Sequence, residues 1–225
     1  MIFIKIIFFG RPGSGKGTYA SRIAPQLGIV HIGTGDMYRA EVAAQTELGK
    51  LAEKFMKNGQ LVPDDVTIKM FKERIAKSDV SKGFILDGFP RTMEQVKALE
   101  GMTKIDLVIN FELDEDVIIE KALARRICEK CGNIYNIADI RRGSLHLPPL
   151  LPKTEGVCDK CGSRLIQRKD DNYETIKERQ DIYMSQSTPL IDYYEEKGLL
   201  VNVPVVGGPD IMVTIILDVI GKQKN

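Results

Sequence analysis

A glycine-rich loop near the start of the chain restricts the possible folds more than any other feature. The loop, Gly10 to Thr18, follows an apolar run from Ile2 to Phe9 and precedes a segment whose apolar residues recur at helical spacing. Its glycines leave backbone N–H groups accessible, the start of a helix adds positive potential, and Lys16 adds a mobile cation. The stretch predicts a cradle for nucleotide phosphates. The alternative is a glycine turn that only joins a strand to a helix.

The loop fits the pattern Gly-x-x-x-x-Gly-Lys with one departure. Gly17 stands where the usual pattern has Ser or Thr, and the hydroxyl comes one residue later at Thr18. The apolar face of the following helix is predicted to comprise Ala20, Ile23, Ala24 and Leu27.

Further short apolar runs indicate an α/β fold with a five-stranded parallel sheet. They are continuous rather than alternating, which is typical of strands buried on both faces, and helical stretches separate them. The runs are 29–32, 83–86, 107–111 and 199–203. In such sheets ligands bind beyond the carboxyl ends of the strands, where the polar clusters of this sequence fall.

Length, composition and charge narrow the class of protein. The chain has 225 residues, of which 43% are hydrophobic and 28% charged, and its net charge is +1. These values are typical of a globular protein and give no overall basic field that would attract nucleic acid. No apolar run approaches the roughly 20 residues of a membrane span, and the first run is too short for a signal sequence. We therefore expect a cytoplasmic protein with no membrane or nucleic-acid partner.

Two polar clusters follow predicted strands. In the first, Thr34 or Asp36 is expected to cap a helix that ends near Ala44, which leaves Arg39 one turn in and able to reach an anion. The alternative is a solvated arginine on a surface helix. Downstream, Pro63 and the two acids after it are expected to start another helix.

The second cluster follows the third strand. Asp87, at the end of a buried strand beside the phosphate loop, is placed to hold Mg²⁺ directly or through water. Arg91 offers a planar fork for a phosphate. The alternative is that the aspartate caps a helix and pairs with the arginine.

The cysteines occur as two pairs, Cys128/Cys131 and Cys158/Cys161, each followed by glycine. In a reducing compartment this spacing favours a metal over disulfides, and it matches four-thiolate zinc sites. All four ligands would be cysteine, so we interpret the zinc as structural, in a segment too small to form its own core. The alternative is a catalytic metal with water as one ligand.

Arginines flank the cysteine region. Arg125 and Arg126 precede it, Arg168 follows it, and Arg179 lies about two turns into the next helix. That helix is expected to begin with a capping box formed by Asp171 and Glu174. Two arginines, Arg168 and Arg179, could converge on a phosphate across the hinge.

Assembled, these motifs resemble adenylate kinase, in the form with a long zinc-containing lid. The similarity covers essentially the whole chain and includes Thr-Gly-Asp-Met-Tyr-Arg, Asp-Gly-Phe-Pro-Arg-Thr and Arg-Lys-Asp-Asp-Asn besides the phosphate loop. The resemblance implies transfer of the terminal phosphoryl group of ATP to AMP with Mg²⁺, giving two ADP. It also implies a core of residues 1–33, 63–124 and 168–225, an AMP lobe of residues 34–62 and a lid of residues 125–167 in a monomer.

The resemblance also assigns residues by motif. Those assigned to ATP are Gly13, Ser14, Gly15, Lys16, Gly17, Thr18, Arg125, Ile134, Tyr135 and Gly208. Those assigned to AMP are Thr34, Arg39, Gln60, Leu61, Val62, Gly88, Arg91, Gln95, Arg168 and Arg179. The catalytic cations would be Lys16, Arg91, Arg125, Arg168 and Arg179, and Asp87 would organise Mg²⁺. A cis peptide bond would fall at Phe89-Pro90.

Some positions depart from the family. Gly33 stands where serine is usual, Lys121 where an arginine is common, and Asn136 where a histidine often follows the tyrosine. The lid loop is about ten residues longer than the usual zinc lid, and its Arg141-Arg142 pair has no evident role.

Two other functions fit part of the sequence. One is a related kinase acting on UMP, CMP or GMP, against which Gln95 and the long lid favour AMP. The other is a nucleotide-dependent nucleic-acid-binding protein that reads its target with the zinc ribbon. The near-zero net charge and the lack of clustered aromatics around the cysteines count against it.

Overall fold

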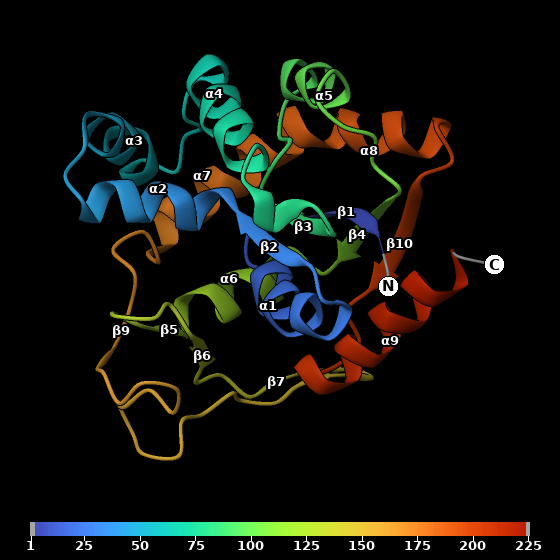
Figure 1. Ribbon diagram of the computed structural model, residues 1–225. Helices are drawn as coiled ribbons and strands as arrows, with labels where there is room; N and C mark the ends of the chain where they lie inside the picture. The colour runs from blue at the N-terminus through green and yellow to red at the C-terminus, as the bar shows by residue number, and fades with distance from the viewer. Residues whose placement is uncertain (1–2, 224–225) are drawn as a thin grey trace.

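The computed structural model describes residues 3–223 and contains a five-stranded parallel sheet with strand order β10-β4-β1-β3-β2 (Figure 1). The predicted α/β fold class is therefore confirmed. The strands of this sheet are β1 Ile4–Gly10, β2 Val30–Gly33, β3 Gly83–Asp87, β4 Leu107–Glu112 and β10 Leu200–Pro204. Each lies within one or two residues of a predicted run, although the start of the first run lies outside the described residues.

Both faces of the sheet are covered because side chains alternate along β1. Ile4, Ile6 and Phe8 belong to one hydrophobic cluster, with α1 and α9, whereas Ile7 and Phe9 belong to another, with α4, α5 and α8. A strand between two apolar layers needs apolar residues on both faces, which explains a continuous apolar run that only the partly buried Lys5 interrupts. The helices of these layers are α1 Lys16–Leu27, α4 Asp64–Ile75, α5 Met93–Glu100, α8 Thr188–Glu196 and α9 Pro209–Lys222.

Two helices, α2 Thr34–Ala43 and α3 Glu47–Lys57, form a lobe after β2. They cross very closely, because a Cβ at Gly49 would lie 2.1 Å from the carbonyl oxygen of Glu41. The lobe has its own small cluster around Tyr38, Ala52 and Val62.

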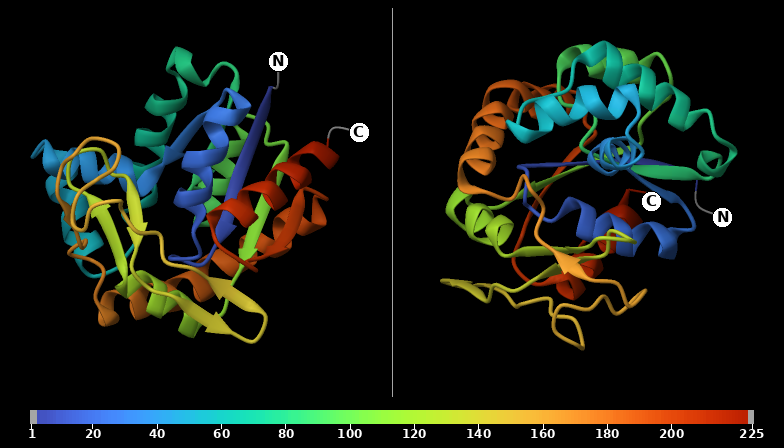
Figure 2. Two further views of the ribbon diagram at one scale, coloured as in Figure 1. Left: turned by 90° about the horizontal axis from the view of Figure 1, so that it is seen from below. Right: turned by 90° about the vertical axis from the view of Figure 1, so that its left-hand side faces the viewer.

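A second inserted region, residues 125–167, is built from short antiparallel strands (Figure 2). A three-stranded sheet has the order β6-β5-β9, and a separate hairpin pairs β7 with β8. The strands are β5 Arg125–Cys128, β6 Ile134–Asn136, β7 Ile140–Arg142, β8 Leu145–Leu147 and β9 Leu165–Ile166. The region is flanked by α6 Glu115–Leu123 and α7 Tyr173–Ile182.

Two predicted helix caps were wrong. Helix α2 starts at Thr34 itself, with the backbone of Gly33 as cap, because the strand runs directly into the helix and Asp36 bonds to Arg39 instead. Helix α7 is capped by Asn172, whose side chain accepts from the N–H of Thr175, because the Asp171 carboxylate is taken by Arg125.

Other local features follow the sequence. The acids after Pro63 begin α4, and the Phe89-Pro90 peptide bond is cis. A short 3₁₀ turn, Ser78–Val80, precedes β3, and a π-helical turn, Tyr183–Ser187, joins α7 to α8. Within residues 3–223, no helix is both long and apolar enough to cross a bilayer.

The close crossing of α2 and α3 yields a stability prediction. Gly49→Ala should lower the free energy of unfolding by about 1–3 kcal/mol, because the added methyl group meets backbone and the two helices must separate. Gly221→Ala is the matched control, since it is also helical and has open space around its Cβ position. Thermal unfolding should place Gly49→Ala below the parent and Gly221→Ala at or above it; equal midpoints would contradict the close contact.

Candidate active site

A cavity of about 240 Å³ lies beyond the carboxyl ends of the sheet strands. Its walls come from the phosphate loop, the α2–α3 lobe, the ends of β2 and β3, the 125–167 region and the loop before α9. Of the residues assigned from the resemblance, Ser14 and Tyr135 do not line it, and all the others do. Ser14 is buried beneath the loop, and Tyr135 packs with the cysteines.

The phosphate loop is shaped by left-handed backbone at Gly13 and Gly15, with φ of 97° and 111°. Only glycine adopts these angles freely, and a Cβ at Gly15 would meet the ring of Tyr19 at 2.8 Å. Gly15 is also the N-terminal cap of α1, so its neighbours' N–H groups border the cavity. The loop thus presents backbone donors at a helix N-terminus, an arrangement suited to polyphosphate.

Lys16 is the cation at the centre of this loop. Its Nζ donates to the carbonyl oxygens of Gly10, at 2.7 Å, and Arg11, at 3.0 Å. Burial, together with the nearby guanidinium groups of Arg91 and Arg125, lowers the pKa of Lys16 to about 8 despite the attraction of Asp87. An anion in the cavity would stabilise its charged form.

Asp87 ends β3 and faces the same loop. Burial opposes its ionisation, but His31 and then Lys16 and Arg91 lower the pKa of Asp87 below its ordinary value, so it is a carboxylate at neutral pH. The Nε2 of His31 lies 3.7 Å from the Asp87 carboxylate. A Cβ at Gly17 would lie 3.1 Å from Asp87 Oδ2, so the aspartate occupies the space that a Ser or Thr side chain would need.

The wall formed by β2, β3 and α5 carries polar groups held by neighbouring backbone. Thr34 Oγ1 donates to the carbonyl of Gly88 at 2.9 Å, and the Nε of Arg91 donates to the same carbonyl at 3.0 Å. The Gln95 side chain accepts from the N–H of Arg91 and donates to Asp64 at 2.6 Å. These bonds fix the orientation of the Gln95 amide at the cavity wall.

Besides Arg39 on α2, four arginines line the cavity. Arg91 comes from the loop after β3, Arg125 from β5, Arg168 from the segment between β9 and α7, and Arg179 from α7. Two are balanced by acids: Arg125 pairs with Asp171, and Arg179 pairs with Asp170 at 2.5 Å. Burial and then the charges of Arg125 and Arg39 lower the pKa of Arg168 to about 9, and its buried Nε has no hydrogen-bond partner among residues 3–223. The cations therefore outnumber the acids that neutralise them, and the cavity is suited to a highly charged anion.

Three residues of this network were not anticipated from the sequence. Asp170 and Asp171 were singled out only as part of a motif and a helix start, yet each holds a cavity arginine. Asp64 was expected only to start a helix, yet it holds Gln95. Asp170 and Asp171 directly follow Lys169 and Arg168 in the sequence, which was a usable signal for them. The hydrogen bond between Asp64 and Gln95 joins residues 31 positions apart and depends on the fold.

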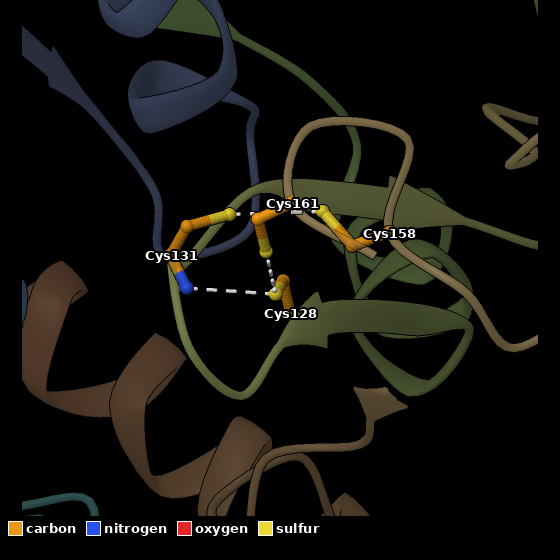
Figure 3. Close-up of side chains that lie close together, drawn as sticks. All are labelled: Cys128, Cys131, Cys158 and Cys161. Carbon is orange, nitrogen blue, oxygen red and sulfur yellow. Dashed lines mark hydrogen bonds between the residues drawn. The ribbon is translucent and has the colours of Figure 1, made fainter. Parts of the chain in front are cut away.

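The four cysteines of the 125–167 region form a cluster whose sulfur atoms all lie within 4.8 Å of one another (Figure 3). The Sγ atoms of Cys128 and Cys161 are 3.4 Å apart, and those of Cys131 and Cys158 are 3.6 Å apart. A tetrahedral zinc with Zn–S bonds of about 2.3 Å requires sulfur separations of roughly 3.8 Å. The cluster is therefore of the right size and chemistry for one such ion.

A family model described as adenylate kinase matches residues 8–199. Curated relatives named adenylate kinase include that of Bacillus subtilis, which is 47% identical over 205 residues, covering 89% of this chain and 90% of the relative. That of Thermosipho africanus is 43% identical over 224 residues, covering 97% and 100%. That of Staphylococcus aureus strain Mu50 is 46% identical over 205 residues, covering 89% and 91%. With this similarity over nearly its full length, and with a cation-lined cavity beside its glycine loop, the chain belongs to the adenylate kinase family.

Proposed function

We propose that the cavity binds two adenine nucleotides at once and carries out the reaction of this family, the reversible transfer of the terminal phosphoryl group of Mg-ATP to AMP, which gives two ADP. The observation that carries the proposal is that Lys16 and four arginines line one cavity. Residues that follow strands in both halves of the sheet contribute to the walls of this cavity. One nucleotide would place its phosphates on the glycine loop and the other on Arg39 and Arg91. The two phosphate chains would then meet between these groups.

The two nucleotides are assigned to opposite sides of the cavity. ATP would use the phosphate loop from Gly13 to Thr18, which follows β1, together with Gly208 before α9 and with Arg125 and Ile134 of the lid sheet. AMP would use Thr34, Gly88 and Gln95, beside β2 and β3, with the backbone of residues 60–62 closing over it. Tyr135 would contribute only through its backbone, because its side chain packs with Cys128 and Cys158.

The chemistry needs positioning and charge neutralisation rather than a base. The acceptor is a phosphate oxygen that is already ionised at neutral pH, so no proton has to be removed from it. Lys16, Arg91, Arg125, Arg168 and Arg179 would stabilise the charge of the transferring group, and their fixed orientation would hold donor and acceptor in line.

Two metals have separate assignments. Mg²⁺ would arrive with ATP and neutralise its phosphates, and Asp87 would organise it from the end of β3, where its carboxylate is ionised. Zinc would bind Cys128, Cys131, Cys158 and Cys161 and stabilise the fold of the lid. Four thiolates leave no position for a catalytic water, which favours a structural role.

The division into parts follows the proposed binding sites. Residues 1–33, 63–124 and 168–225 would be the core, residues 34–62 the AMP lobe and residues 125–167 the lid. Closure of the lid would exclude water, which otherwise could accept the phosphoryl group. We further propose a cytoplasmic protein, as the thiolate metal site favours, and one that acts on free nucleotides rather than nucleic acid, as the near-zero net charge favours. By the family resemblance it would be a monomer.

The acceptor preference is the direct test of this function. With Mg-ATP as donor, we expect AMP to be phosphorylated much faster than CMP, UMP or GMP, because Gln95 is held with its amide at the acceptor wall. Coupled assays on the four monophosphates at equal concentration would measure this. A preference for UMP or CMP would overturn the acceptor assignment, and submicromolar, salt-sensitive binding of RNA or DNA would favour the nucleic-acid alternative.

Replacing Lys16 separates catalysis from stability. Lys16→Met should lower turnover by roughly 10³-fold, because it removes a charge that faces the transferring phosphoryl group. The ligand-free protein should be as stable as the parent, or more stable by up to about 3 kcal/mol at pH 7, since the pKa of about 8 means that folding opposes the charged form. That penalty is full below about pH 8 and disappears as the pH approaches the unfolded value of 10.5.

The exposed residue Lys82 supplies the control, and Lys82→Met should change neither quantity. Steady-state kinetics and thermal unfolding between pH 7 and pH 10 give both readouts. Turnover of Lys16→Met within tenfold of the parent would contradict the role of the glycine loop.

The metal site can be tested through its ligands. Cys128→Ser combined with Cys131→Ser should abolish zinc binding and lower the unfolding temperature more than it lowers turnover in the cold, because the ion stabilises the lid rather than the reacting groups. Lys130→Ser, an exposed residue between the two ligands, should retain one zinc per chain. Metal analysis of the parent comes first, and a metal-free parent would refute the zinc assignment.

A further inference from the structure

The β7–β8 hairpin explains the unusual length of the lid loop and its Arg141-Arg142 pair. Paired residues share a face of an antiparallel ribbon, and successive residues alternate between faces. Ile140 pairs with Leu147, and Arg142 pairs with Leu145, so these four share one face, whereas Arg141 and His146 lie on the other. The two adjacent arginines therefore point in opposite directions.

The polar side chains on the outer face of the hairpin contact one another and solvent. His146 Nε2 lies 2.7 Å from Asp139 Oδ1, and Arg141 lies 3.3 Å from the same carboxylate group. The side chain of Arg141 is two-thirds exposed. Nothing on this face contacts the core through an ion pair among the described residues.

The inner face is docked on the core. Ile140 and Leu147 are only 1% and 6% exposed and belong to the hydrophobic cluster that includes α1 and α9. Arg142 bonds to Glu120 on α6 at 2.7 Å and lies 3.9 Å from Asp116. Exposed ion pairs contribute little energy, so the apolar pair anchors the hairpin while Arg142 fixes its position along α6.

The docked hairpin also forms part of the cavity wall. Ile140, Leu147 and Pro148 line the cavity together with Gly207, Gly208 and Pro209. The ring of Pro148 lies against Gly208, where an added Cβ would be 3.0 Å from its Cγ. The hairpin and the loop that follows β10 thus form an apolar corner of the cavity. In Figure 1, β7 runs below α9 in the lower part of the view.

The corner lies on the donor side of the cavity. The hairpin docks on α6 and α9, which follow β4 and β10 at one edge of the sheet, whereas Thr34 and Gly88 follow β2 and β3 at the other edge. Lys121 lies on this side too, and its Nζ donates to the carbonyl of Ser14 at 3.2 Å.

We propose that the inserted hairpin is a wall of the donor-base pocket: Pro148 packs on the flat face of the base, Ile140 and Leu147 anchor the wall on the core, and Arg142 is a positioning residue that holds it on α6. The inference rests on the proposed function, in which the donor is ATP. Base faces are apolar and stack on apolar surfaces, so the wall adds affinity for a nucleoside triphosphate but none for its phosphates alone.

A comparison of ATP with inorganic tripolyphosphate isolates the contribution of the base. By calorimetry on the zinc-loaded protein, Ile140→Ala combined with Leu147→Ala should raise the Kd for ATP by roughly tenfold and leave that for tripolyphosphate within about twofold. The KM for AMP should also stay within about twofold, because the acceptor side is untouched.

A charge reversal on the exposed surface provides a second route that does not alter the core. Arg142→Glu should raise the Kd for ATP several-fold by repelling Glu120 and Asp116, and Glu120→Arg in the same chain should restore it. Arg141→Glu makes the same charge change on the outer face and should have no effect on ATP. Tripolyphosphate corrects each variant for long-range charge.

The outcomes separate the two levels of the proposal. If the parent binds ATP and phosphorylates AMP but Arg142→Glu behaves like Arg141→Glu, the hairpin wall is wrong and the enzymatic function stands. If the parent binds ATP no better than tripolyphosphate, no base pocket exists on this side. If the parent binds ATP but does not phosphorylate any monophosphate, the proposed function fails while the wall can still be measured.

Discussion

Burial of several cations in one cavity is the constraint on which the site depends. Burial first, and then repulsion from neighbouring cations, lowers the pKa of Lys16 and Lys121 to about 8 and that of Arg168 to about 9. Asp87, Asp170 and Asp171 relieve this only in part. A polyphosphate would neutralise the remaining charge, and the state with the most negative charge would gain the most from these cations.

Holding such a site open requires a rigid frame, and the double-sided sheet supplies it. Alternate residues of β1 are packed into two separate hydrophobic layers, so the strand that leads into the phosphate loop is fixed on both faces. The loop then turns on glycine angles that no other residue adopts freely, and α1 leaves it with its N-terminus toward the cavity. Burial of β1 on both faces therefore fixes the position of the phosphate loop.

The two inserted regions are too small to form a large hydrophobic core, so each needs another source of stability. In the lid sheet, a metal held by the four thiolates would provide the stability that a hydrophobic core provides elsewhere. The β7–β8 hairpin instead packs Ile140 and Leu147 into the hydrophobic cluster of the core. The two anchors act at different points of the same region. A metal alone would fix its internal structure, and the hairpin fixes where the region rests on α6 and α9.

The sequence alone determined the frame, because its signals are local. Continuous apolar runs, the glycine loop with Lys16, and two Cys-x-x-Cys pairs each depend on neighbouring residues, and they predicted the parallel sheet, the phosphate cradle and the thiolate cluster. Only the tertiary structure decided how polar groups are shared between distant segments. Asp171 leaves its own helix start to bind Arg125, Asp64 reaches across 31 residues to Gln95, and Arg142 turns to α6 while Arg141 turns to solvent. A polar side chain binds whichever partner the fold brings within hydrogen-bond distance. Local sequence patterns contain no information on distances between segments that are far apart in the chain, so they cannot predict that partner.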